Sequence, residues 1–170
     1  RTQPIRKARR AGYYWVMTAI HSGKLHWFWG DTNRTRYPLG QYQTSGAMSR
    51  LPADGGLDPS VGVDLTYFVD DQGFSKRICP FSKENPIWID GLLTVNDDNG
   101  HERLVTNYKR MKSLGEVLEH GLALFNDERQ EFERHHEFKL SETWRAPRDH
   151  PVRVRYADRD DDDFLFPAPY

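Results

Sequence analysis

The feature that most constrains this chain is a hairpin pattern that recurs along it. In each copy, an extended apolar segment runs into a turn rich in Gly, Asn, Asp or Ser, and a second extended segment runs out. The clearest copy has residues 87–95 before the turn 96–100 and residues 101–108 after it. Gly, Asn and Asp tolerate the positive φ of tight hairpin turns. The pattern therefore predicts antiparallel sheets.

The spacing of the hairpins predicts how the sheets are arranged. Equivalent turns recur at 22–23, 98–99 and 160–161, with a further hairpin turn at 70–73. Four consecutive antiparallel strands make one blade of a β-propeller. We therefore predict an all-β fold of four-stranded β-propeller blades, about two and a half of them in this chain. The predicted strands are 13–20, 25–29, 43–50, 65–69, 74–78, 87–95, 103–110, 120–125, 132–140, 153–156 and 164–166.

The predicted blades divide the chain into segments. We expect one incomplete propeller domain over 1–170, with a basic arm at 1–10 and a partial first blade at 13–78. A complete second blade covers 86–140, and a third blade begins at 150–170. A closed propeller needs at least about four blades. The expectation is therefore that the remainder of the propeller comes from a longer chain.

Helix is the main alternative for two segments. Residues 113–125 carry leucine and valine at helical spacing, and the charge pattern of 128–140 is also compatible with a helix. Gly115 and Gly121 weaken the helical interpretation of the first segment. We expect strands in both, and a helix in either would defeat the propeller prediction.

Composition limits the classes of function. The net charge is −1, which gives no electrostatic basis for binding nucleic acid, and the basic arm is typical of a solvated terminus. No apolar run reaches the ~20 residues of a membrane span. The single cysteine, Cys79, excludes an internal disulfide and follows an apolar strand, which favours a buried thiol.

Two aspartates are the candidate catalytic residues. The first strand of each propeller blade lines the central channel, and Asp90 lies in such a strand, where a carboxylate needs a partner or a wet cavity. Asp31 follows a Trp- and Phe-rich strand. The structural alternatives are that Asp90 caps a bend beside Gly91 and that Asp31 closes an Asx turn.

Aromatic and basic side chains near these positions are candidates for binding a substrate. Indoles offer apolar platforms for sugar faces, although packing between blades is the more common use of such residues. Arginine binds carboxylates through two parallel hydrogen bonds, or else stacks on a neighbouring ring. The candidates are Trp29, Trp88, Arg34, Arg145 and His150, with Trp27 as a further platform.

We expect no cofactor and no metal site. The acidic turn 158–163 has the oxygen density of a Ca²⁺ site but lacks the glycine and the distal glutamate of an EF-hand loop. Solvated carboxylates in a hairpin turn explain it better, and Ca²⁺ remains the alternative. His135 and His136 are adjacent, so in a strand they point to opposite faces and do not form a metal pair.

Three segments resemble a known family. Residues 86–100, Pro-Ile-Trp-Ile-Asp-Gly-Leu-Leu-Thr-Val-Asn-Asp-Asp-Asn-Gly, resemble the strand-turn signature of five-bladed propeller glycosidases of the arabinanase and β-xylosidase type. Residues 120–127, followed by Phe132 and Glu133, resemble the later strands of such a blade. Residues 27–32 resemble the first-blade motif of related propellers.

The resemblance implies a carbohydrate-active protein. The family uses three channel carboxylates: a base Asp, an orienting Asp and an acid Glu. Asp31 matches the first and Asp90 the second, whereas no Glu lies in the first strand of a predicted blade. The expected function is glycoside hydrolysis of an oligo- or polysaccharide by an extracytoplasmic or secreted protein, with no nucleic-acid or membrane partner. The alternatives are a propeller polysaccharide lyase using His150, Tyr108 and Arg145, and a non-catalytic propeller that binds glycan or protein.

Overall fold

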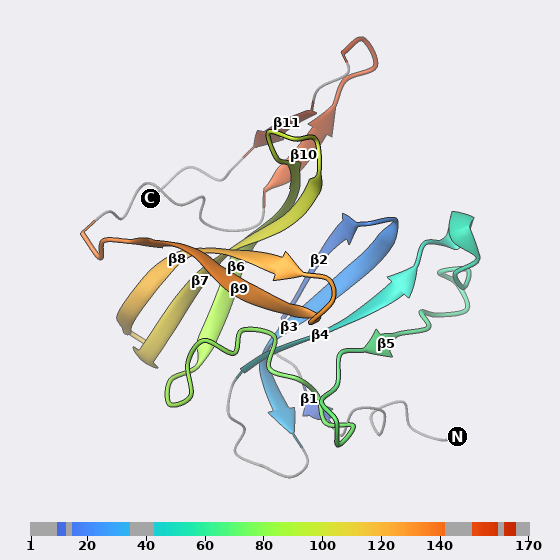
Figure 1. Cartoon of the computed structure of the whole chain (residues 1–170). Coiled ribbons are helices and arrows are strands. Elements are labelled where there is room, and N and C mark those ends of the chain that lie inside the picture. The colour runs from blue at the N-terminus through green and yellow to red at the C-terminus, as the bar shows by residue number, and fades with distance from the viewer. Residues whose placement is uncertain (1–9, 13–14, 35–42, 142–150, 160–161, 166–170) are drawn as a thin grey trace.

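The protein folds into antiparallel β-sheets (Figure 1). The computed structural model describes residues 10–12, 15–34, 43–141, 151–159 and 162–165, with the backbone alone at 10–12, 31–34 and 162. These ranges contain no α-helix and one 3₁₀ turn, η2 (Pro52–Asp54). The strands are β1 (Arg10–Gly12), β2 (Val16–His21), β3 (Lys24–Arg34), β4 (Gln43–Arg50), β5 (Thr66–Tyr67), β6 (Ile87–Asn96), β7 (Glu102–Ser113), β8 (Glu116–Asn126), β9 (Glu131–Phe138), β10 (Val152–Arg155) and β11 (Asp162–Leu165).

The first sheet is a meander of β2, β3, β4 and β5, called the β2–β5 sheet below. Each strand pairs antiparallel with the next one along the chain. The β3–β4 register shifts between Trp29 and Thr32, and beyond this irregularity the end of β3 pairs with the short β1. Ser22 and Gly23, both at positive φ, make the tight turn between β2 and β3, as the turn chemistry predicts.

The second sheet is a four-stranded meander in the order β6-β7-β8-β9, called the β6–β9 sheet below. Its register shifts in every strand pair, including a bulge between Asp90 and Leu93 where Gly91 has a φ of 59°. Gly121 on β8 lies so close to β9 that a Cβ there would overlap the carbonyl oxygen of His136. Glycine at this position therefore lets the two strands approach.

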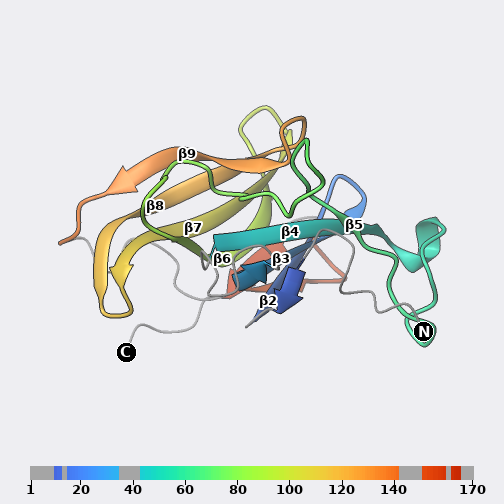
Figure 2. The ribbon, with the colours of Figure 1, turned by 90° about the horizontal axis from the view of Figure 1, so that it is seen from below.

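The two sheets lie one above the other and share a single core (Figure 2). Phe28 and Phe68 from the first sheet region meet Phe125 and Phe132 from the second, with ring centroids 5.2 to 6.3 Å apart. Such tilted and edge-on contacts are the favoured geometry of aromatic pairs. The remaining buried members of this core are Met17, Ile78, Cys79, Ile87, Ile89, Leu92, Leu104, Tyr108 and Ala123.

Hydrogen bonds also join the two sheets. The hydroxyl of Thr44 donates to the carbonyl of Ile87 at 3.0 Å, and the hydroxyl of Thr94 donates to the carbonyl of Ile20 at 2.7 Å. These buried hydroxyls need partners, and they find them on the facing strand. The relative position of the sheets is therefore fixed by directional bonds as well as by apolar packing.

The structure agrees with the predicted all-β, antiparallel class and excludes the helical alternatives. Residues 113–125 and 128–140, for which helix was the alternative, contain β8 and β9. The predicted strand 74–78 is wrong: the turn 70–73 forms, but the only ladder contact after it is an isolated bridge between Val69 and Ser75. Within the described ranges β10 and β11 form a separate two-stranded hairpin, and no sheet closes on itself.

Candidate functional site

Asp90 lies at the bulge of β6, on the face of the β6–β9 sheet that points away from the core. Its Oδ1 accepts a hydrogen bond from the backbone N–H of Gly91 at 2.9 Å. Its Oδ2 lies 3.7 Å from the Nζ of Lys109, and about a quarter of the side chain (27%) is exposed. The bond to Gly91 is the bend-capping geometry that the sequence offered as the structural alternative. The carboxylate nevertheless reaches solvent.

The strand register places other polar and aromatic groups beside Asp90. Trp88, Lys109, His120 and Phe138 are consecutive partners across the four strands, and Trp88 lies two residues before Asp90 along β6. The Nε1 atom of Trp88 is buried and has no hydrogen-bond partner in the structure. His120 contacts the carbonyl of Lys139 through its Nε2 atom at 3.1 Å. This face therefore presents a carboxylate, an ammonium and an imidazole together.

The structure describes the other predicted site residues only in part. Asp31 and Arg34 lie in the last part of β3, but their side chains are outside the described part of the chain, as are Arg145 and His150 altogether. Whether Asp31 and Asp90 converge therefore stays a prediction. Trp29 is buried, and its ring lies 6.0 Å from that of Tyr67.

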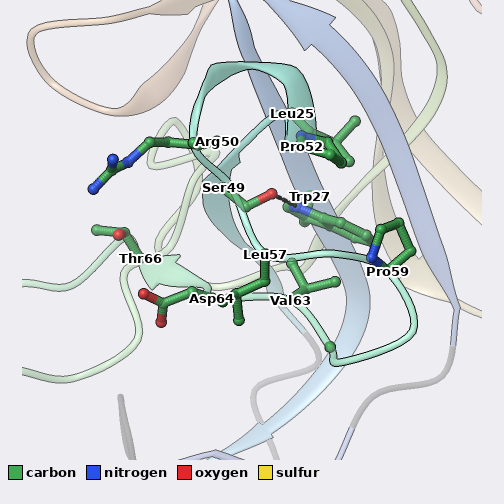
Figure 3. A pocket seen from close by; sticks show the side chains of 13 residues that line it. Leu25, Trp27, Ser49, Arg50, Pro52, Leu57, Pro59, Val63, Asp64 and Thr66 are labelled. Carbon is green, nitrogen blue, oxygen red and sulfur yellow. Dashed lines mark hydrogen bonds between the residues drawn. The ribbon is translucent and has the colours of Figure 1, made fainter.

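A pocket of about 280 Å³ lies on the outer face of the β2–β5 sheet (Figure 3). Trp27 of β3 contributes its indole, whose Nε1 donates to the hydroxyl of Ser49 on β4 at 3.0 Å. This bond fixes the plane of the ring. The other lining residues are Leu25, Arg50, Pro52, Gly55, Gly56, Leu57, Pro59, Gly62, Val63, Asp64 and Thr66.

The long loop between β4 and β5 folds back to form the pocket wall. Its first turn closes on Leu51, whose carbonyl accepts the N–H groups of Asp54 and Gly56, both at 2.9 Å. Gly55 has a φ of 83°, and a Cβ at Gly56 would overlap the backbone of Leu51, so both positions require glycine.

A second turn of the same loop forms around Asp58. Its carbonyl accepts the N–H of Val61 at 2.8 Å, and its Oδ1 accepts the N–H of Ser60 at 2.7 Å. The Ser60 hydroxyl also donates to Oδ1, and this bond, followed by that from the Ser60 N–H, lowers the pKa of the Asp58 carboxyl below its usual value. This is the Asx turn that the sequence suggests for an aspartate before proline.

The pocket has an apolar side and a polar side. Figure 3 shows Trp27 and Pro59 on one side and Arg50, Asp64 and Thr66 together on the other. Among the residues that the structure describes, neither Arg50 nor Asp64 forms an ion pair or a side-chain hydrogen bond. Two unpaired charges beside an indole are therefore available to a ligand.

A buried ionic cluster lies at the edge of the core, between β7, β8 and β9. Glu119 accepts from the Tyr108 hydroxyl at 2.6 Å, from Arg110 Nε at 2.9 Å and from Arg134 at 2.6 Å. Burial alone would raise the pKa of the Glu119 carboxyl, but these donors outweigh it and hold that pKa below its usual value. Burial, and then the neighbouring Glu119, raise the pKa of Tyr108. Each group has a partner on a neighbouring strand, so the cluster joins strands.

A second polar cluster surrounds His21 where three hairpin turns meet. The ring nitrogens of buried His21 each lie 3.1 Å from a carboxylate oxygen, Nδ1 from Glu102 and Nε2 from Asp127. Glu102 also accepts the backbone N–H of Ser22 at 2.6 Å. The contacts connect the β2–β3 turn with two elements of the β6–β9 sheet. Neither this cluster nor the one at Glu119 was apparent from the sequence, because both unite residues far apart along the chain.

The described ranges contain no group of three or more His, Cys, Asp or Glu side chains arranged to hold a metal ion. They also contain no helix with the length and apolarity needed to cross a membrane. Part of the acidic turn falls outside them, and Asp163 pairs with Arg159 at 2.9 Å. Comparison of the chain with protein-family models, with curated proteins and with solved structures finds no match.

Proposed function

We propose that this chain is part of a carbohydrate-binding β-propeller and that the Trp27 pocket is its sugar-binding site. The observation that carries the proposal is the pairing of a fixed indole with unpaired polar groups in one pocket. A sugar ring has an apolar C–H face and a rim of hydroxyls that donate and accept hydrogen bonds. An indole opposite Arg50, Asp64 and Thr66 is complementary to both parts.

The outer face of the β6–β9 sheet supports the propeller architecture. In a two-layer sandwich the outward positions are expected to be polar. Leu93, Val105 and Leu124 are half-buried register partners on the outer face of this sheet. Apolar side chains on both of its faces suit a sheet stacked between two others, as a blade is.

The strand arrangement supports the same architecture. Both sheets are four-stranded meanders, and the first strands of the two, β2 and β6, are joined by the bond from Thr94 to Ile20. Adjacent blades bring their first strands together around the axis. The proposal includes further blades from a longer chain and an extracytoplasmic location, where polysaccharides are accessible.

A binding experiment tests the proposal. Isothermal titration of the 170-residue chain with xylan, arabinan, cellulose-derived and starch-derived oligosaccharides should give saturable binding to at least one of them. Trp27→Ala should remove the binding, because the apolar platform is lost. Trp15→Ala is the matched control, since Trp15 is a partly exposed indole that immediately precedes β2 and lies outside the pocket. Binding that persists in Trp27→Ala with an unchanged affinity would refute this site.

Glycoside hydrolysis is the second candidate, favoured by the solvent-accessible carboxylate of Asp90 on β6 with Lys109 nearby. In that case Asp31 activates water or stabilises the transition state, and Asp90 holds the sugar, with the acid supplied elsewhere. An experimental structure should then place the Asp31 and Asp90 carboxylates about 5 to 10 Å apart. Asp90→Asn should abolish release of reducing sugar without weakening binding at Trp27. Hydrolysis that is unaffected by Asp90→Asn would rule out this assignment.

A further inference from the structure

We infer that the Trp27 pocket takes the terminal unit of a neutral glycan chain and not its interior; the inference rests on the proposed sugar-binding function. The first argument is size. The pocket holds about 280 Å³, below the ~300 Å³ at which pockets for drug-sized ligands begin. This volume suits one sugar ring. An internal chain segment needs space for its neighbours on both sides.

The second argument is the construction of the wall. The lining comes from β3, from the end of β4 and from the single loop that leads from β4 to β5. Two hydrogen-bonded turns, one closing on Leu51 and one on Asp58, hold that loop over the outer face of the sheet. The loop is therefore a fixed wall of the pocket, and it narrows the space for a polymer that continues on both sides of a bound ring.

The third argument concerns charge. Arg50 and Asp64 lie on the same side of the pocket and carry opposite charges, so the polar side has no net charge. A carboxylate accepts hydrogen bonds from sugar hydroxyls, and a guanidinium donates to hydroxyl or ring oxygens. A uronate would gain attraction from Arg50 and lose it to Asp64. The arrangement therefore favours a neutral ring that offers both donors and acceptors.

The experiment compares chain ends with chain interiors. The 170-residue chain is titrated with xylo-, arabino-, cello- and malto-oligosaccharides of increasing length and with the parent polysaccharides. Terminal binding predicts the same affinity per chain from the shortest to the longest oligosaccharide. At equal sugar-unit concentration it predicts at least about tenfold weaker apparent binding to the polysaccharide, whose ends are dilute. Oligogalacturonate should bind at least about tenfold more weakly than the neutral ligand.

A matched pair of variants tests the role of the charged side. Asp64→Asn should weaken binding of the short oligosaccharide by about tenfold through loss of a charged acceptor. Asp98→Asn, a change in an exposed turn away from the pocket, should leave it unchanged.

The outcomes separate this inference from the proposed function. If affinity per chain rises steadily with length, or the polysaccharide binds as well per sugar unit, terminal recognition is refuted although sugar binding stands. If oligogalacturonate binds best, or Asp64→Asn behaves like the control, the neutral-ligand assignment is refuted. If none of the sugars binds, both the inference and the proposed function fail.

Discussion

Acidification should destabilise the fold through His26, which is buried in the aromatic core. Its side chain is 3% exposed, and its ring lies 5.4 Å from that of Phe125 and 6.1 Å from that of Phe68. Burial, and then the nearby His21, lower the pKa of His26 from 6.5 to about 4. The folded protein therefore keeps this ring neutral at pH values where the unfolded chain protonates it.

The size and direction of the effect follow from linkage between protonation and folding. Between pH 6.5 and pH 4 the unfolded state binds more protons at His26, so the contribution of the neutral ring is fully present above pH 6.5 and is lost as the pH falls. One pKa unit corresponds to about 1.4 kcal/mol. The drop from 6.5 to about 4 therefore corresponds to a loss of roughly 3 kcal/mol in the free energy of unfolding.

Urea unfolding followed by tryptophan fluorescence, repeated from pH 7.5 to pH 4, measures this loss. Other groups titrate in the same range, so the informative quantity is the difference between the wild type and His26→Leu. That difference should change by about 3 kcal/mol across the interval. His135→Leu, at an exposed position on β9, is the matched control for replacing a histidine by leucine. Equal pH slopes for the wild type and His26→Leu would refute the argument.

Three further predictions concern packing, the ionic cluster and the thiol. Gly121→Ala should lower the free energy of unfolding by more than about 2 kcal/mol because its Cβ would overlap β9, whereas Gly115→Ala meets no neighbouring atom and should have little effect in the same urea assay. Glu119→Leu should cost about 1 to 3 kcal/mol by removing the acceptor of the buried Tyr108 hydroxyl, and equal stability in urea would contradict that role. Cys79, whose pKa is raised by burial and then by a nearby glutamate, should resist a thiol reagent in the native state and react in urea; rapid native labelling would contradict its burial.

Much of the fold could be predicted from the sequence because its hairpins are specified locally. The turn between β6 and β7 illustrates this: Asp97 Oδ1 accepts the N–H groups of Asn99 and His101 at 3.0 and 2.9 Å, and Gly100 has a φ of 78°. These bonds, that to His101 first, hold the pKa of the Asp97 carboxyl below its usual value. Turn and flanking strands are thus encoded within a few consecutive residues.

The segment after the turn 70–73 shows where local reasoning fails. Its apolar residues predict a strand, but Phe74 and Ile78 are buried in the core instead of extending a ladder. The N–H of Ile78 donates to the carbonyl of Thr44 at 3.2 Å, and the carbonyl of Ile78 accepts the N–H of Phe132. The segment therefore connects β4 with β9. Its conformation is set by strands distant in sequence, which no local pattern reveals.

The candidate site was predictable in part. Asp90 was singled out as a catalytic candidate, and that role stays a prediction; the bond from the Gly91 N–H is the structural alternative that the sequence also suggested. The pocket was missed because residues 51–62 look like an ordinary Gly- and Pro-rich loop in the sequence. Only the folded loop brings its Pro59 and Leu57 opposite Trp27, and nothing in their spacing indicates that contact.

The polar clusters and the Trp27 pocket differ in how their charged side chains are partnered. Glu119 accepts from three side chains of the same sheet, and the buried ring of His21 lies between two carboxylates, so these groups serve the fold. Arg50 and Asp64 have no such partners among the described residues, although they stand beside an indole whose orientation is fixed. Folding alone explains the clusters at Glu119 and His21. The side chains of Arg50 and Asp64 are exposed instead, and the proposed neutral, hydroxyl-rich ligand would give them partners at the side of a preformed pocket.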